Sequence, residues 1–126
     1  MAELLYFQPD DLRDYIVRFL TSCAVPEEQA RTTAAVLTSA DLRGIHTHGI
    51  AQLHVYYGDR LRTGLIEPET RYDIVQETAS TICFDAGNGL GQPAGVHAMW
   101  ACLEKASTHA IEIATVRKGN HSGSDG

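Results

Sequence analysis

The sequence predicts an α/β chain in which N-terminal helices are followed by a strand–strand–helix–strand unit. Up to about residue 64, apolar residues recur at the three-to-four-residue spacing of amphipathic helices. Beyond residue 70 the spacing changes to the alternation of strands, interrupted by one further helical stretch. The chain has 126 residues, of which 44% are hydrophobic and 21% charged, and this is enough to form a packed core.

Three helices are expected in the first half. Pro9 precedes two aspartates and Pro26 precedes two glutamates, and both patterns are typical of a helix first turn. Gly44 is the expected end of the second helix, and a third helix is expected between Gly49 and Gly64. The expected inner faces are Leu12, Tyr15, Ile16, Phe19 and Leu20 in the first helix, Ala30, Ala34 and Leu37 in the second, and Ile50, Leu53, Tyr57 and Leu61 in the third.

The second half predicts a small sheet and one helix. Short strands are expected at residues 72–76 and 80–85, followed by a glycine-rich turn. A fourth helix is indicated by Val96, Met99, Trp100 and Leu103, and a last strand by the alternation in residues 111–116. Nothing between residues 64 and 70 has the composition of a flexible linker, although a boundary there is compatible with the change of period.

Charge and composition exclude several classes of partner. The formal net charge is −6 and no basic stripe is present, which argues against nucleic acid and against anionic membrane surfaces. No apolar run approaches the ~18 residues of a membrane span, and no signal peptide is recognisable, so we expect a cytoplasmic protein. Cys23, Cys83 and Cys102 are far apart and odd in number, so we expect reduced thiols rather than disulfides.

A glycine-rich segment, Gly87-Asn88-Gly89-Leu90-Gly91, lies between an expected strand and an expected helix. Dinucleotide phosphate loops occupy such a position between a strand and a helix. Their sequence fingerprint, however, requires a glycine at its sixth position and an acidic residue at the end of the next strand. The sixth position here is Gln92, and the next strand ends without an acid. The segment is therefore interpreted as a tight turn.

Histidines are the residues best suited to chemistry. His121 follows the last expected strand on a short polar loop, and histidine has the side-chain pKa nearest neutrality. His46 and His48 have the H-x-H spacing of some metal ligands, and His54 or His121 could complete such a site. No acidic ligand lies nearby in the sequence, so we expect no metal. Another interpretation is that His46 and His48 cap or pack the start of the third helix.

Two tyrosines and two further histidines are assigned by their place on helices. Tyr57 falls on the apolar face of the third helix, whereas Tyr56 lies off that face and is free to reach a polar site. His97 and His109 lie within and at the end of the fourth helix, and we assign both to structure.

Three spaced segments resemble one enzyme family. They are ADLRGIHTHG at residues 40–49, FDAGNGLGQ at residues 84–92 and VRKGNHSG at residues 116–123. Together and in this order they are similar to motifs of the malate/L-lactate dehydrogenase family that includes ureidoglycolate, sulfolactate and diketogulonate dehydrogenases. This family is distinct from the Rossmann-fold lactate and malate dehydrogenases. The resemblance covers nearly the whole chain but only about the first third of a family member.

The resemblance implies a larger non-Rossmann fold and a set of site residues. His121 matches the acid–base histidine, and His48 matches a histidine beside substrate and nicotinamide. Thr47 replaces the family's serine but keeps a hydroxyl. Gln52 stands where the family commonly has an arginine that grips the substrate carboxylate, and a glutamine supplies no charge. The expected substrate-binding residues are Thr47, Gln52 and Tyr56.

The implied reaction is hydride transfer between NAD or NADP and a small 2-hydroxy or 2-oxo acid, in an enzyme that is a homo-oligomer. In this interpretation residues 1–66 form a helical region, and residues 67–126 begin an α/β nucleotide-binding region that is incomplete. No cofactor-binding residue can be assigned from the chain, and we expect residues 1–126 alone to be inactive. The alternative hypothesis is a non-catalytic module that associates with itself or with a partner chain.

Overall fold

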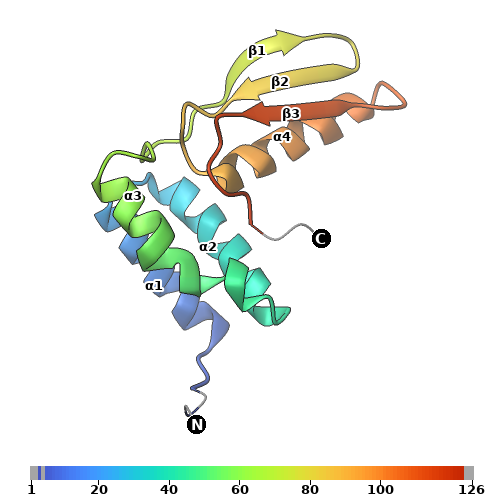
Figure 1. Cartoon of the computed structure of the whole chain (residues 1–126). Helices are drawn as coiled ribbons and strands as arrows, with labels where there is room; N and C mark the ends of the chain where they lie inside the picture. The colour runs from blue at the N-terminus through green and yellow to red at the C-terminus, as the bar shows by residue number, and fades with distance from the viewer. Residues whose placement is uncertain (1–2, 4, 124–126) are drawn as a thin grey trace.

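The computed structural model describes residue 3 and residues 5–123, which form a helical part and a sheet part lying side by side (Figure 1). The α-helices are α1 (Pro9–Ser22), α2 (Glu27–Leu42), α3 (Asp59–Arg62) and α4 (Gly91–Ala106), and the strands are β1 (Asp73–Glu77), β2 (Thr81–Asp85) and β3 (Ile113–Arg117). The predicted order of N-terminal helices, two strands, a helix and a strand is confirmed.

The core of the helical part lies between α1, α2 and the segment that leads into α3. Pro9 begins α1, Pro26 directly precedes α2, and acidic residues occupy the first turn of both helices, in agreement with the sequence-based prediction. The buried cluster consists of Ile16, Leu20, Val25, Ala30, Ala34, Leu37, Leu53, Tyr57, Leu61, Ile66 and Leu90. Most of the predicted inner faces are therefore confirmed. Tyr15 is an exception, because it is 41% exposed and its hydroxyl lies 2.8 Å from His54 Nε2.

The predicted regular third helix is wrong in its first half. Residues after Gly44 form two 3₁₀ turns, η1 (His46–His48) and η2 (Ile50–Gln52), then a π turn, η3 (Leu53–Gly58), before α3 begins. Gly49 separates the two 3₁₀ turns with φ −102° and ψ −148°, which is not a helical conformation. Gly58 packs so closely on α1 that a Cβ there would lie 2.7 Å from Phe19 Cζ. Close packing and the break at Gly49 thus interrupt the helix.

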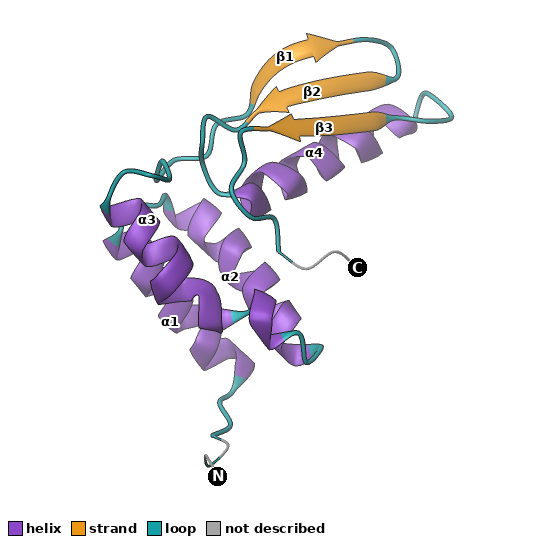
Figure 2. Ribbon diagram, in the orientation of Figure 1, coloured by secondary structure: helices purple, strands orange, loops and turns teal. Residues whose placement is uncertain are grey.

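The sheet has the order β1-β2-β3, and α4 covers one face of it (Figure 2). β1 and β2 are antiparallel, whereas β2 and β3 are parallel and are joined through α4. The parallel register pairs Asp85 at the end of β2 with Arg117 at the end of β3. The loops after β2 and β3 therefore leave the sheet at the same edge, where they meet the helical part.

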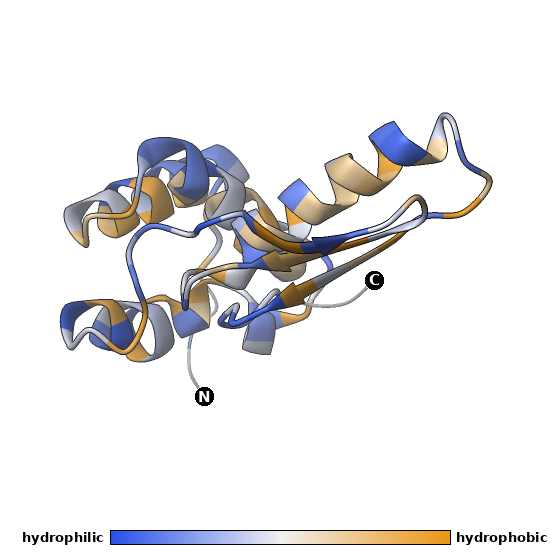
Figure 3. Ribbon diagram, turned by 90° about the horizontal axis from the view of Figure 1, so that it is seen from above, coloured by the Kyte–Doolittle hydropathy of each residue, from blue (hydrophilic) through white to orange (hydrophobic). Residues whose placement is uncertain are grey.

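The large apolar residues that indicate α4 in the sequence do not enter the core. Val96, Met99, Trp100 and Leu103 are 38%, 60%, 67% and 55% exposed. Viewed from above, α4 extends away from the α1–α3 part, with hydrophobic residues spread along it (Figure 3). Its contact with the sheet is made instead by Ala98 and by the His97 ring, which stacks on Tyr72 at a centroid distance of 4.1 Å. The small and flat side chains face the sheet because the strands lie close to the helix.

Two smaller observations complete the fold. Among the described residues, no helix is long and apolar enough to cross a membrane. The three cysteines are free thiols, and each is half-buried rather than fully buried.

Candidate active site

His121 lies on the loop that follows β3, and hydrogen bonds from Asn120 hold this loop against the start of α4. The Asn120 N–H donates to the Gly89 carbonyl (2.9 Å), and the Gly91 N–H donates to the Asn120 carbonyl (2.7 Å). The Asn120 amide nitrogen also donates to the Asn88 backbone and side-chain oxygens at 2.9 and 3.0 Å. His121 itself has φ +45°, an uncommon value for a residue with a side chain. The surrounding contacts therefore fix the backbone from which the imidazole projects.

Gly91 makes this approach of the His121 loop to α4 sterically allowed. A Cβ at Gly91 would lie 2.6 Å from the His121 carbonyl oxygen and 3.0 Å from that of Asn120. Both are backbone atoms, which cannot rotate away as a side chain can. A glycine at the first residue of α4 is thus a requirement of the site's geometry.

Asp41, near the end of α2, holds the backbone on both sides of His48. The Asp41 carboxylate accepts the Ile50 N–H at 2.8 Å and lies 3.2 Å from His46 Nδ1. A Cβ at Gly49 would overlap this carboxylate, so glycine allows the close contact. His46 and His48 consequently diverge. His46 is exposed beside Asp41, whereas the His48 ring lies 5.5 Å from that of His121.

Aromatic rings from two segments, η1 and η3, surround the His121 imidazole. The His48 ring is stacked on it with an interplanar angle of 29°, and the Tyr56 and Tyr57 rings lie 5.5 and 5.8 Å away, centroid to centroid. Tyr56 is in turn covered by the Arg60 guanidinium, 4.1 Å above its ring. Burial and, secondarily, the nearby His48 lower the pKa of His121 below its ordinary value. The neutral imidazole is therefore favoured, as a proton acceptor near neutral pH requires.

Tyr57 and Gln92 belong to the site although the sequence analysis gave them no role there. The Tyr57 hydroxyl lies 2.5 Å from His121 Nδ1 and accepts a hydrogen bond of 2.6 Å from Gln92 Nε2. Burial raises the pKa of Tyr57 well above its usual range, so the hydroxyl keeps its proton. A tyrosine on an apolar face needs a partner for its hydroxyl, and this is the signal that could have indicated Tyr57.

The remaining predicted substrate-binding residues form a second hydrogen-bonded group. The Thr47 hydroxyl lies 3.0 Å from His48 Nδ1, and Gln52 Nε2 donates to the Thr47 carbonyl at 2.7 Å. Thr47 is exposed, and His48 and Gln52 are half-buried. One of the two N–H donors of the Gln52 amide is therefore used on the backbone, which leaves one donor and no charge for a substrate carboxylate.

The histidines do not converge on a metal site in the part of the chain described. His54 lies beside Tyr15 and against the Phe19 ring, away from His121. Among the described residues, no group of three or more His, Cys, Asp or Glu side chains is arranged to hold a metal ion. The His48–His121 pair is thus surrounded by tyrosines rather than by further ligands.

The glycine-rich turn after β2 does not offer a cradle for a dinucleotide phosphate. The Gly87 N–H donates to the Asp85 carboxylate, the Asn88 N–H to Lys118 and the Gly89 N–H to Ala86. The first N–H of α4, that of Gly91, is used by Asn120. Phosphate loops depend on free backbone N–H groups, so these residues do not fit the pyrophosphate of NAD or NADP.

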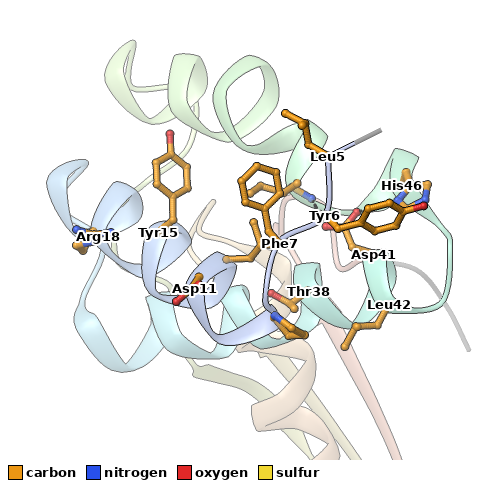
Figure 4. Close-up of a pocket in the computed structure, with 13 residues that line it drawn as sticks. Leu5, Tyr6, Phe7, Asp11, Tyr15, Arg18, Thr38, Asp41, Leu42 and His46 are labelled. Atoms are coloured by element: carbon orange, nitrogen blue, oxygen red, sulfur yellow. Dashed lines mark hydrogen bonds and ion pairs between the residues drawn. The ribbon is translucent and has the colours of Figure 1, made fainter. Parts of the chain in front are cut away.

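A separate cavity of about 920 Å³ lies on the far side of η1 (Figure 4). It is lined by the N-terminal segment with Leu5, Tyr6 and Phe7, by α1, and by the end of α2. Only His46 of the predicted histidines borders it, and none of His48, Tyr56, Tyr57 or His121 does. The cavity is therefore separate from the residues around His121.

Sequence and structure comparisons identify the family. The malate/L-lactate dehydrogenase family profile matches residues 7–126. The chain belongs to the malate/L-lactate dehydrogenase family. A malate dehydrogenase of Pyrococcus abyssi is 40% identical over 114 residues, which are 90% of this chain and 31% of that protein. The L-sulfolactate dehydrogenase of Methanocaldococcus jannaschii is 34% identical over 94% of this chain and 34% of its own length.

Solved structures agree with this family assignment. The malate dehydrogenase of Entamoeba histolytica superposes with a TM-score of 0.91 at 32% identity, over 96% of this chain and 34% of that one. The chain thus spans about a third of the length of the relatives it matches. The predicted resemblance to this family, and the predicted coverage of one third, are both confirmed.

Proposed function

We propose that the chain supplies the acid–base half of the active site of an NAD- or NADP-dependent dehydrogenase for small 2-hydroxy acids. The observation that carries this proposal is the meeting of His48 and His121, 73 positions apart in the sequence, with ring centroids at 5.5 Å. Relatives that act on malate and on sulfolactate contain the matching segment. The particular acid and the choice between NAD and NADP are not assigned.

His121 is the proposed proton carrier. Its Nδ1 is engaged by Tyr57, so Nε2 is the nitrogen available to the oxygen on carbon 2 of the substrate. During oxidation Nε2 accepts the hydroxyl proton in the tautomer that carries the ring proton on Nδ1, and during reduction Nε2 returns a proton to the carbonyl oxygen. His48, oriented by the Thr47 hydroxyl, borders the same space and orients the substrate with Tyr56. The nicotinamide, when bound, would supply the hydride chemistry.

The proposal is tested in a chimera. Residues 7–123 replace the matching segment of the Entamoeba histolytica malate dehydrogenase, and malate oxidation is measured with NAD⁺ and with NADP⁺. We expect turnover, and His121→Asn in the chimera should lower kcat by about 10²–10⁴, the usual contribution of general acid–base catalysis. The melting temperatures of the two proteins must agree, so that the loss is not one of folding.

A second variant of the chimera addresses the carboxylate site. Gln52→Arg places a cationic donor where Gln52 supplies no charge, so it should lower KM for the 2-hydroxy acid. A folded chimera that shows no turnover, with or without Gln52→Arg, contradicts the proposed function. Turnover within a few-fold of the parent chimera after His121→Asn removes His121 from the mechanism.

The 126-residue chain alone is expected to be inactive. Hydride transfer needs substrate and nicotinamide held ~3–3.5 Å apart in one oriented site. In the glycine-rich turn the N–H groups of Gly87, Asn88, Gly89 and Gly91 already have acceptors, and position 52 carries no cation. Incubation with NADH or NADPH and a panel of 2-oxo acids should give no absorbance loss above that of a His121→Ala control. Turnover would show that a complete site assembles from this segment.

A second candidate function, a non-catalytic association module, is favoured by one surface. Val96, Met99, Trp100 and Leu103 recur at helical spacing along α4 and are exposed. Light scattering over a hundredfold dilution tests this second candidate, because burying this stripe requires an oligomer. A Trp100→Glu variant is the matched control, since it should dissociate the oligomer. A monomer at every concentration contradicts the module.

A further inference from the structure

Two buried side chains, Gln92 and Tyr57, form a hydrogen-bonded chain that ends at His121. Gln92 from the first turn of α4 donates to the Tyr57 hydroxyl at 2.6 Å, and that hydroxyl lies 2.5 Å from His121 Nδ1. Tyr57 is 0% and Gln92 1% exposed, so water does not reach the polar atoms that link them. Each hydrogen in the chain must therefore be given to a neighbour within it.

The donor order of this chain determines the tautomer of His121. An amide nitrogen can only donate, so the Tyr57 oxygen accepts from Gln92 Nε2. The tyrosyl hydrogen is then directed to His121 Nδ1, which must accept it. A neutral His121 consequently carries its own proton on Nε2.

One atom is left without a partner in this order. Gln92 Oε1 is buried and accepts no hydrogen bond in the part of the chain described. A half-turn of the amide exchanges its oxygen and nitrogen with little change in shape. Tyr57 then donates to Gln92 Oε1, and its oxygen becomes an acceptor for a proton on His121 Nδ1. The same three side chains thus have two donor orders.

We propose that Gln92 and Tyr57 are positioning residues that set which ring nitrogen of His121 carries the proton. With the Gln92 nitrogen toward Tyr57, the neutral imidazole is protonated on Nε2. With the Gln92 oxygen toward Tyr57, Nδ1 carries a proton, and Nε2 is free to accept another. Only the second order leaves Nε2 able to act as a base: when it accepts the hydroxyl proton of a substrate, the substrate O–H bond breaks and an Nε2–H bond forms. His121 is then an imidazolium whose Nδ1 proton is donated to the Tyr57 oxygen, while the Tyr57 hydroxyl donates to Gln92 Oε1.

The catalytic meaning of this arrangement rests on the proposed function, whereas the tautomer of His121 does not. The other titratable groups facing His121 are His48 from η1 and Tyr56 from η3, and Arg60 lies on the far face of Tyr56. α4 contributes the neutral Gln92. On the β3 side, Arg117 and Lys118 are paired with Asp85. A tautomer measurement is therefore more specific than a pH profile, which His48 also affects.

The test uses ¹⁵N-labelled residues 1–126 and long-range ¹H–¹⁵N spectra of the histidine rings. His121→Asn assigns the His121 signals. We expect neutral His121 to be protonated on Nε2, and the side-chain amide signals of Gln92 to shift with the same midpoint as His121. The second measurement needs no variant beyond the assignment. A Gln92 amide that stays constant through the His121 titration, or a neutral His121 protonated on Nδ1, overturns the proposal.

Variants separate the donor order from simple packing. Gln92→Leu removes the acceptor that the protonated state needs, so the pKa of His121 should fall further. Tyr57→Phe should release His121 into a mixture of tautomers. Tyr56→Phe is the matched control, because the Tyr56 ring contacts His121 and its hydroxyl has no role in the chain of donors. It should leave the tautomer unchanged.

The variant results are interpreted only for chains whose amide spectra remain dispersed. An unchanged tautomer and pKa in both Gln92→Leu and Tyr57→Phe overturn the proposal. None of these measurements involves turnover. An inactive chimera with an intact donor order would contradict the proposed function alone, and an active chimera without the donor order would contradict this inference alone.

Discussion

Gly91→Ala is predicted to destabilise the chain and displace His121. The added Cβ would lie 2.6 and 2.8 Å from the His121 carbonyl oxygen and carbon, and 3.0 Å from the Asn120 oxygen. Inserting a methyl group into a packed site typically costs ~1–3 kcal/mol. Separating the loop from α4 also loses the Gly91–Asn120 hydrogen bond, a further ~1 kcal/mol. Alanine returns at most ~1 kcal/mol of helix propensity, so the expected net loss is about 1–3 kcal/mol.

Gly95→Ala, in the same helix, is the matched control. Gly95 is exposed, and no atom lies within 4 Å of a Cβ built there. The same chemical change should therefore stabilise the chain by up to ~1 kcal/mol through helix propensity alone. Urea unfolding followed by circular dichroism measures both free energies, and the His121 ring signals should move only in Gly91→Ala. A Gly91→Ala chain as stable as Gly95→Ala would refute the steric reasoning.

Three further predictions concern other parts of the site. Gly49→Ala should unfold at lower urea than the wild-type chain and shift the Ile50 amide signal, because its Cβ would overlap the Asp41 carboxylate; unchanged stability would mean that Asp41 moves freely. Because the pKa of His121 is lowered on folding, the unfolded chain binds more protons than the folded chain below pH ~6.5. The free energy of unfolding should therefore fall as pH drops through this range. His121→Asn should make the free energy of unfolding less dependent on pH there. The pKa of Asp85 is lowered by the Gly87 N–H and then by Arg117 and Lys118. The stabilisation of the folded state by this carboxylate should therefore be present above pH 3.8 and be lost as pH falls through the folded-state pKa. An Asp85→Asn chain whose free energy of unfolding falls as steeply with acid would contradict this prediction.

Local signals in the sequence determined the elements and their order. Proline followed by acidic residues marked the starts of α1 and α2, and Gly44 and Gly64 ended helical segments in the left-handed conformation, with φ +75° and +78°. These features act within a few residues of the backbone they control, so the sequence is enough to recognise them. Strand ends shifted by only one or two residues, since pairing with a neighbour decides where a strand stops.

Contacts between distant segments decided what the sequence left open. The sequence correctly placed Tyr57 on an apolar face. It did not predict that the Tyr57 hydroxyl contacts His121, 64 residues further along the chain. In the sequence, Gln92 served only as evidence against a dinucleotide phosphate loop. The fold buries its side chain beside Tyr57. The sequence also did not reveal that the apolar stripe on α4 is exposed, because helical spacing identifies a face of the helix but not what covers that face. The sequence therefore identified the histidines as the residues suited to chemistry. The side chains that contact His121 were decided by how the loop after β3 packs against η1, η3 and α4.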